Sequence, residues 1–408
     1  MGYLHREKEY QNDSDPSDSP ERAAGYGNTY DPGFNRITGT GVGVPIASFN
    51  KAQERRLMAK VDLRLIPVLS VLYLLAFIDR TNIANAAVYG FTTDLGTPKG
   101  SNDYNTALTL FFVLYILFEI PSNIILKRLK PHVWLPMCMM AFGILTVCQG
   151  LVSSIGGLYA VRLFLGLAEA GMFPGCFYLI GMWYKRSEAQ KRFSFFFSST
   201  SLAGAFSGLL AAALSHMDGL GGYRAWRWIF IIEGLLTCVC AAFFFFIVPN
   251  FPEDAKFLSI AEKEFIKQRV AEDQGKSAIE RRIGFSDVVN VFKDYKIIVG
   301  GFMYFGLIVP AYSYAFFAPL IISGFNYSPV QTQLYSVPPW AAAFGFAMFM
   351  AFLSDLAQHR FTFILIAISA SISGFAIQLA PGLSDKIKYG GLFLVAAGTY
   401  AAMPLIGE

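Results

Sequence analysis

Residues 65–85 read LIPVLSVLYLLAFIDRTNIAN, an apolar run that carries an adjacent acid and base, Asp79 and Arg80, past its middle. A run of about 20 apolar residues is long enough to cross a bilayer as a helix. An ionisable side chain at that depth costs at least ~2.5–3.5 kcal/mol, and such residues face the interior of a bundle or a water-filled cavity. The pair therefore either pins helices together or lines a path for a substrate or for protons, and we favour the second interpretation.

The composition indicates an integral membrane protein. Apolar residues make up 54% of the 408 residues and charged residues only 15%, against roughly 25% charged residues in soluble domains. The five cysteines lie in apolar segments, without the spacing of a disulfide framework or a metal site. The sequence also contains no Walker motif and no nucleophile elbow. We therefore expect no enzymatic activity, no cofactor and no nucleic-acid partner.

Ten segments have the length and apolar character of membrane-spanning helices, which predicts an all-α membrane protein. A polar tail, residues 1–60, is expected to be disordered and cytosolic. A polar loop at 250–294, with a short surface helix expected from Ile260 to Glu272, separates six segments (61–249) from four (295–408). This layout is typical of a transporter built from two halves. The ten segments are 65–87, 105–127, 133–152, 157–182, 193–215, 227–248, 295–322, 333–354, 361–380 and 389–406.

The basic residues predict the orientation of the chain. Lys and Arg gather at 51–64, 127–130, 185–192 and 256–296, which all lie on one side of the membrane if the ten spans alternate in direction. The loops expected on the other side carry few basic residues. Because basic loops stay on the cytosolic side, we expect a cytosolic N-terminus in a protein of the plasma membrane.

The predicted fourth span carries a second acid and base. Arg162 and Glu169 are seven residues apart, which is two helical turns with only ~20° of rotation between them. Their side chains therefore point the same way, about 10 Å apart along the helix. Gly166, between them, permits the close approach of a neighbouring helix. Together with Asp79 and Arg80 they form either a closed, rigid network or a functional site, and we favour a site because buried ion pairs stabilise less well than apolar packing.

An internal repeat relates the two parts of the sequence. Ser122 to His132 follows the second predicted span, and Ala351 to Arg360 follows the eighth. Both stretches resemble the small-x-x-x-Asp-basic-x-Gly-basic turn that joins the second and third helices in each half of the major facilitator superfamily. The second copy keeps Asp355 and Arg360, whereas Leu126 stands in the place of the acid in the first copy.

Five motifs follow one another along the chain: DRTNIAN (79–85), FEIPSN (118–123), RLFLGLAE (162–169), WRWIFIIEG (226–234) and PNFPEDAKFL (249–258). Together they resemble the signatures of the anion:cation symporters of the major facilitator superfamily, and most of all the fungal allantoate permease branch. The resemblance extends from about residue 55 to the end of the sequence. It implies the major facilitator fold of two pseudo-symmetric halves with twelve spans, of which about ten are expected here.

The resemblance also implies roles for the charged residues. In the family, the arginine of the first span contacts the substrate carboxylate, and this position falls on Arg80. The proton-binding acids fall on Asp79 and Glu169, and Arg162 matches the arginine that pairs with them. We also assign Arg162 and Asn82 to the substrate site. A fixed guanidinium in a low-dielectric cavity suits a carboxylate, and carboxyl groups in such surroundings can exchange protons near neutral pH. Protonation of either acid would then free an arginine to receive an anion.

The predicted seventh span adds aromatic candidates for the substrate site. Tyr312 and Tyr314 lie between Pro310 and Pro319, a pattern that predicts a bendable helix with an aromatic lining. Aromatic residues in spans are mostly packing or interfacial residues, so that alternative stays open for both tyrosines. We assign structural or gating roles to six further residues: Glu119, Asn123, Arg227, Glu233, Asp355 and Arg360.

The sequence thus predicts a monomeric secondary transporter in the lipid bilayer that imports a small organic anion by proton symport. Vitamin-like or nitrogen-source carboxylates such as nicotinate, pantothenate or allantoate are the expected substrates, and the aromatic residues favour a flat one such as nicotinate. Three alternatives stay open: a uniporter, a sensor that does not transport, and an inactive product truncated after the tenth span.

Overall fold

The computed structural model describes residues 49–98, 101–274, 293–357 and 359–406. Within these ranges the secondary structure is helical and contains no strand. The predicted tail up to residue 48 and the part of the polar loop at 275–292 lie outside the described residues.

Nine helical segments in the described ranges are long and apolar enough to cross a membrane, and they occupy the first nine predicted spans. The tenth predicted span forms α15 (Asp385–Ile406), which is not among the nine but packs against α12, α13 and α14. The nine segments are α1 (Lys51–Val88), α3 (Asp103–Arg128), α4 (Pro131–Leu151), α5 (Ile155–Glu169) with α6 (Met172–Trp183), α7 (Arg186–Leu214), α8 (Ala225–Ile247), α12 (Tyr295–Ser323), α13 (Pro329–Ala357) and α14 (Arg360–Leu379).

Helix α1 begins earlier than the sequence suggested. Residues 51–60, which we assigned to the disordered tail, are helical. Their charged side chains are held by α9 (Ile260–Gln274), which confirms the short helix predicted in the polar loop: Lys60 pairs with Glu262 at 3.1 Å and Glu54 with Arg269 at 2.7 Å. The remaining short elements are α2 (Phe91–Asp94), η1 (Ser215–Met217), η2 (Leu220–Gly222) and η3 (Pro252–Asp254).

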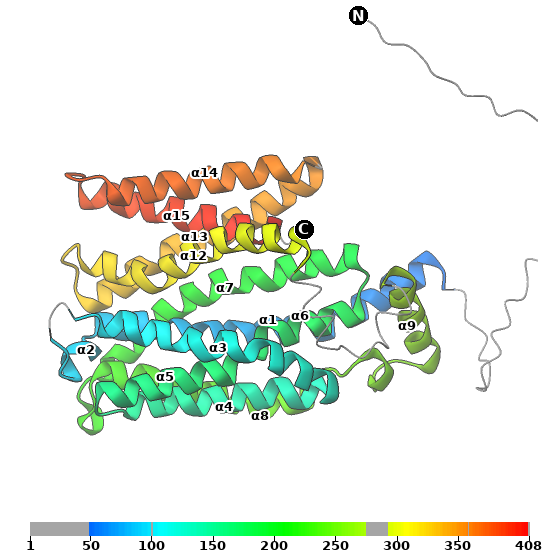
Figure 1. The fold of residues 1–408 in the computed structure, drawn as a ribbon, viewed down its shortest axis with the longest axis horizontal. Coiled ribbons are helices and arrows are strands. Elements are labelled where there is room, and N and C mark those ends of the chain that lie inside the picture. The colour runs from blue at the N-terminus through cyan, green and yellow to red at the C-terminus, as the bar shows by residue number, and fades with distance from the viewer. Residues whose placement is uncertain (1–48, 99–100, 275–292, 358, 407–408) are drawn as a thin grey trace, which may run out of the picture. The chain divides into compact units, whose positions relative to one another are not determined.

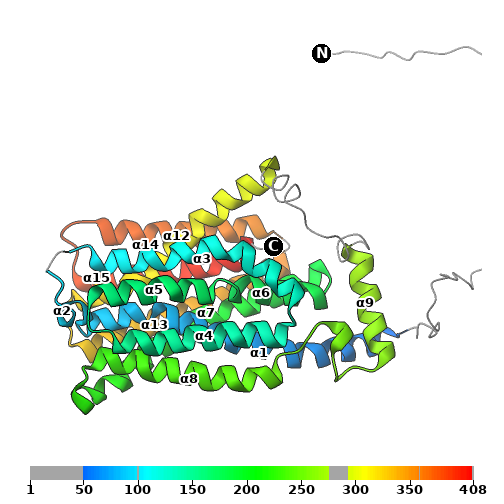
Figure 2. The same ribbon diagram turned by 60° about the horizontal axis from the view of Figure 1, so that its bottom comes forward.

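The helices form a bundle in which α1 and α7 occupy the centre (Figure 1). Helices α12 to α15 lie on one side of this pair, and α4, α5 and α8 lie on the other; Figure 2 shows α9 at the end of the bundle, beside the start of α1. Helix α1 contacts α4, α6, α7, α8, α12 and α13, and every residue from 75 to 86 is buried. The charged stretch is therefore inside the bundle, as the sequence predicted.

The outer surface of the bundle is apolar. Large side chains such as Phe246, Phe302 and Leu379 are exposed on it. In water an apolar surface of this kind would favour association or aggregation, but in a bilayer it faces lipid tails. This surface and the helix lengths agree with an integral membrane protein.

Two local features of the fourth span position its acid. Gly166 lies so close to the backbone of Phe111 in α3 that a Cβ atom at this position would overlap its carbonyl, which confirms the predicted close approach. The span is also broken, because α5 ends at Glu169 and α6 starts at Met172. Pro174 has no N–H to donate to the carbonyl of Ala170, so the helix cannot continue regularly through this point.

Candidate functional site

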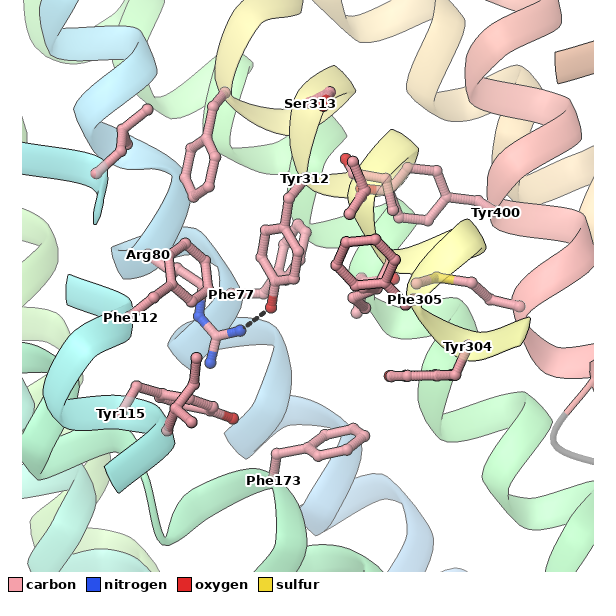
Figure 3. A pocket seen from close by; sticks show the side chains of 18 of the residues that line it. Phe77, Arg80, Phe112, Tyr115, Phe173, Tyr304, Phe305, Tyr312, Ser313 and Tyr400 are labelled. Atoms are coloured by element: carbon pink, nitrogen blue, oxygen red, sulfur yellow. Dashed lines mark hydrogen bonds between the residues drawn. The ribbon is translucent and has the colours of Figure 1, made fainter. Parts of the chain in front are cut away.

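A cavity of about 580 Å³ lies among α1, α3, α6, α7, α12 and α15. Figure 3 shows Arg80 and Tyr312 meeting at its edge, with Phe112, Tyr115 and Phe173 nearby. Half of its lining residues are aromatic, which gives flat, weakly polar walls. These residues are Tyr73, Phe77, Phe112, Tyr115, Phe173, Phe197, Tyr304, Phe305, Tyr312, Phe316, Phe317 and Tyr400.

Arg80 is the cation of this cavity. Its side chain is 3% exposed, and its Nε and Nη2 atoms donate hydrogen bonds to Glu169 Oε1 at 3.0 and 2.6 Å. Its Nη1 atom donates to the hydroxyl of Tyr312, as the dashed line in Figure 3 marks. The guanidinium also lies over the rings of Phe111 and Tyr115, 5.4 and 5.1 Å from their centroids. Acid, phenol and aromatic faces therefore hold the cation in one orientation.

The hydrogen bond between Arg80 and Tyr312 joins the two parts of the chain that the polar loop separates. Arg80 comes from α1 and Glu169 from the end of α5, whereas Tyr312 comes from α12 on the other side of the cavity. The Tyr312 ring stacks on Phe316 at 5.6 Å and meets Phe112 of α3 edge-on at 5.3 Å. Because this tyrosine lines the cavity and bonds the cation, the structure brings together three of the residues selected from the sequence.

Asp79 lies on a different face of α1 from Arg80. Successive residues of a helix differ by about 100° in direction, and Asp79 accepts a hydrogen bond from Thr237 of α8 at 2.7 Å. It is 2% exposed and does not line the cavity. Its second oxygen, Oδ1, has no hydrogen-bond partner among the described residues. Asp79 and Arg80 are adjacent in sequence, but their side chains contact different helices: Asp79 contacts α8 and Arg80 contacts α5.

Arg162 is 1% exposed, and its Nε and Nη2 atoms have no hydrogen-bond partner within the described ranges. Arg162 does not line the cavity either. Among the described residues the ion pair of Glu169 is made with Arg80 and not with Arg162, the partner that the family resemblance implied.

Two further residues expected at the substrate site lie away from the cavity walls. Asn82 is fully buried, and its Oδ1 atom accepts hydrogen bonds from Ser207 at 3.1 Å and Asn85 at 3.4 Å. Tyr314 is buried between Trp340 and Tyr400, with ring centroids 4.9 and 6.4 Å away. These ring contacts are those of a packing residue, which is the alternative that the sequence left open for Tyr314.

The residues assigned to structural or gating roles divide into groups. Glu119 lines the cavity, whereas Asn123 does not. Arg227 donates to the carbonyls of Gly150 and Val152 at 3.1 and 2.7 Å and reaches Asp94 at 3.6 Å, so it binds the ends of neighbouring helices. Glu233 is buried without a hydrogen-bond partner in the described part of the chain. Arg360 begins α14, and the side chain of Asp355 lies outside what the structure describes.

Sequence reasoning missed most of the aromatic wall. Phe112, Tyr115 and Glu119 lie on one stripe of α3, and Tyr304 and Tyr312 lie on one stripe of α12. The α3 residues are three and four positions apart, and the two tyrosines of α12 are eight apart, which is two steps of four; both spacings keep side chains on one helix face. That spacing was visible in the sequence, but apolar residues surround each stripe, so the face that points inward could not be chosen without the packing.

Comparisons with known proteins relate this arrangement to a family. The sequence profile described as Major Facilitator Superfamily matches residues 69–407. The chain is 34% identical over 368 residues to the uncharacterized transporter C1002.16c of Schizosaccharomyces pombe, a match that covers 90% of this chain and 73% of that protein. It is 35% identical over 373 residues to the MFS-type transporter cnsO of Penicillium expansum, covering 88% of this chain and 71% of that protein.

A solved structure shows the same fold. The crystal structure of a bacterial homolog of the human lysosomal transporter Spinster, inward-facing and unoccupied, matches with a TM-score of 0.61 and 20% identity. The match covers 84% of this chain and 73% of that one. From the profile match and the sequence identities, we conclude that this integral membrane protein belongs to the Major Facilitator Superfamily.

Proposed function

We propose that this protein is a proton-coupled transporter that imports a small organic anion. The observation that carries the proposal is the position of Arg80, a buried guanidinium at the wall of an aromatic cavity whose anionic partner is an acid able to take up a proton. A guanidinium offers several donors in a fixed plane and suits a carboxylate ligand. The carboxylate of Glu169 stands where the carboxylate of a substrate would bind.

Proton coupling follows because Glu169 and the substrate carboxylate compete for Arg80. While Glu169 is ionised it neutralises Arg80, and an arriving anion has to compete with it for the same donors. When Glu169 binds a proton, the ion pair is lost and Arg80 is free to bind the anion. Among the two acids proposed from the sequence, Glu169 is favoured for this step, because Asp79 contacts Thr237 and not Arg80.

Tyr312 connects substrate binding to the packing of α1 against α12. Its hydroxyl contacts Arg80 across the cavity, so α1 and α12 are joined at the substrate site. A ligand shifts a conformational equilibrium only through contacts that differ between the two states. An anion that displaces the phenol from the guanidinium would change the contact between α1 and α12, and alternating access requires such a change.

The cavity favours a compact carboxylate with a flat part. Its walls are aromatic, and Arg80 and Glu119 are the charged residues among the described lining residues. Flat ligands gain from stacking on such walls. Nicotinate fits this description better than the polar allantoate or the longer pantothenate. We propose the plasma membrane as its location, and the distribution of basic residues favours a cytosolic N-terminus.

The test is uptake of a labelled carboxylate panel by transporter-deficient cells at two external pH values, with and without a protonophore. The proposal expects accumulation of at least one carboxylate that rises at acidic external pH and is abolished by the protonophore. Uptake that stops when the internal and external substrate concentrations are equal, and that the protonophore does not change, would identify a uniporter. Specific binding without uptake would identify a sensor, and both results would contradict the proposal.

A further inference from the structure

Glu119 is the second charged residue of the aromatic cavity, and the transport step proposed above does not use it. Arg80 and Glu119 are the charged side chains among the described lining residues. Glu119 is partly exposed, and its carboxylate has no hydrogen bond or ion pair within the described ranges. Arg80, in contrast, gives its donors to Glu169 and Tyr312. The cavity therefore offers a ligand an acid as well as a cation.

Contacts between α3 and α12 give the position of Glu119 along the cavity. Near one end, the Tyr104 hydroxyl donates to the carbonyl of Phe316 at 2.8 Å. Farther along α3, the ring of Phe112 meets Tyr312 edge-on at 5.3 Å. Glu119 lies seven residues beyond Phe112, about 10 Å along the helix, and is the last α3 residue in the cavity wall. The acid therefore stands at the opposite end of the cavity from the Tyr104 contact.

Tyr115 relates Glu119 to Arg80. The guanidinium of Arg80 lies over the Tyr115 ring, 5.1 Å from its centroid. Glu119 follows Tyr115 by four residues, so the two share one face of α3 and are separated by about 6 Å along its axis. Both line the cavity together with Arg80. A small ligand that spans about one helical turn can therefore contact both charges.

The aromatic side chains at this end of the cavity suit a cation. Tyr304 comes twelve residues before Phe316 on α12, so it lies at the same end of the cavity wall as Glu119. Figure 3 shows Tyr115, Phe173 and Tyr304 on different sides of the same space. Aromatic faces attract cations, and cages of aromatic rings bind ammonium groups. A carboxylate beside such rings adds a direct charge partner.

We propose that Glu119 binds a cationic or N–H donor group of the substrate, so that the transported carboxylate also carries a basic nitrogen. The substrate carboxylate would contact Arg80, the nitrogen would contact Glu119, and the flat part would lie between the aromatic walls. This inference rests on the proposed function and narrows its substrate class from carboxylates in general to amphoteric ones. Nicotinate belongs to this class when its ring nitrogen is protonated.

The test compares two probes that differ in one charge. N-methylnicotinate carries a fixed positive nitrogen in its ring, and 3-methylbenzoate has the same shape without that charge. Their Kd values for the purified full chain are measured by titration calorimetry at one pH. We expect the wild type to bind N-methylnicotinate about tenfold more tightly than 3-methylbenzoate. Glu119→Gln should remove most of this difference without changing the Kd of 3-methylbenzoate, which also shows that the variant is folded.

Three further variants complete the test. Glu119→Asp keeps the charge and should keep part of the preference for N-methylnicotinate. Glu264→Gln removes an exposed acid of α9, makes the same change in net charge, and should keep the whole preference. Arg80→Lys should weaken the binding of both probes alike, because both carry the carboxylate.

Several results would overturn the inference. Equal Kd values for the two probes in the wild type, or a preference that survives in Glu119→Gln, would show that Glu119 does not bind the positive group. Tighter binding of both probes by Glu119→Gln would show that Glu119 competes with the substrate for Arg80. In each case the proposed function stands if Arg80→Lys weakens both probes, and the proposed anion site fails if it weakens neither. If neither probe binds the wild type, the inference and the preference for flat carboxylates are both wrong, and the uptake panel alone decides the proposed function.

Discussion

At the scale of single residues, the two buried arginines differ in what holds them. Arg80 donates to Glu169 and Tyr312, whereas the Nε and Nη2 atoms of Arg162 find no partner in the described part of the chain. Both belong to motifs that resemble those of one family, and the sequence treats them alike. Arg80 lines the cavity and Arg162 does not, so Arg80 is the proposed ligand-binding cation.

Replacing Arg80 by Lys keeps the charge but removes the planar set of donors. We expect the KM for the anion to rise at least about tenfold, because the loss of one charged hydrogen bond costs about 1.5–3 kcal/mol. The control is Arg224→Lys, since Arg224 is 67% exposed and pairs with Asp94 outside the cavity. Uptake kinetics measure the effect, and an unchanged KM in Arg80→Lys would show that the ion pair is structural.

At the scale of elements, the break between α5 and α6 and the contact of α5 with α3 fix the place of Glu169. Gly166 brings the two helices together just above the break. The acid then stands at a helix end, where its side chain can reach α1. The element that carries the proposed proton-binding acid is thus positioned by a glycine and a proline on either side of it.

Adding one methyl group tests this packing. Gly166→Ala should lower the Tm of the purified protein, since overpacking costs about 1–3 kcal/mol and a Cβ atom here would overlap the backbone of Phe111. Gly156→Ala on the same helix is the matched control, because a Cβ atom there meets nothing within 4 Å. That control should leave the Tm unchanged or slightly raised, since Ala favours a helix over Gly by about 1 kcal/mol. Equal Tm values for the two variants would contradict the close contact.

At the scale of the whole molecule, charged residues of the polar loop fasten its helix and turns to the ends of the spans. Arg269 of α9 bonds both Glu54 of α1 and Glu188 of α7. Asp254, at the start of the loop, contacts Lys130, which precedes α4, at 2.8 Å. The hydrogen bond from Lys130 and the charge of the lysine lower the pKa of Asp254 below its usual value. These contacts join the loop to the first half of the bundle.

The lowered pKa of Asp254 predicts how acid affects this attachment. A carboxyl group whose pKa is lower in the folded protein stabilises the fold at neutral pH and loses that contribution as the pH falls through its folded-state pKa. Lys130→Met should therefore lower the Tm slightly at neutral pH, since exposed pairs contribute only about 0–1 kcal/mol. The Tm difference from wild type should vanish in strong acid. A difference that grows on acidification would contradict the assignment.

The sequence predicted the spans well and the cavity poorly, for physical reasons. A helix that crosses a bilayer needs a long apolar run, so the spans could be predicted from the sequence. The short helix at Ile260 could be predicted from its charged stretch in the polar loop. Residues 51–60 were assigned to the tail because their charges meet partners more than 200 positions away. Asp79 and Arg80 were treated as one site, although the geometry of a helix separates neighbouring side chains. Which stripe of α3 or α12 faces the cavity depends on packing between distant helices.

The central claim is that Glu169 gives up Arg80 to the anion when it binds a proton, and Glu169→Gln tests it most directly. The measurement is uptake into proteoliposomes of the carboxylate identified by the panel, with and without an inward proton gradient, beside exchange of internal for external substrate. Because glutamine is neutral and cannot titrate, exchange should persist while accumulation against the substrate gradient disappears. If Glu169→Gln still concentrates the substrate in response to the proton gradient, Glu169 is not the coupling acid and the account is wrong.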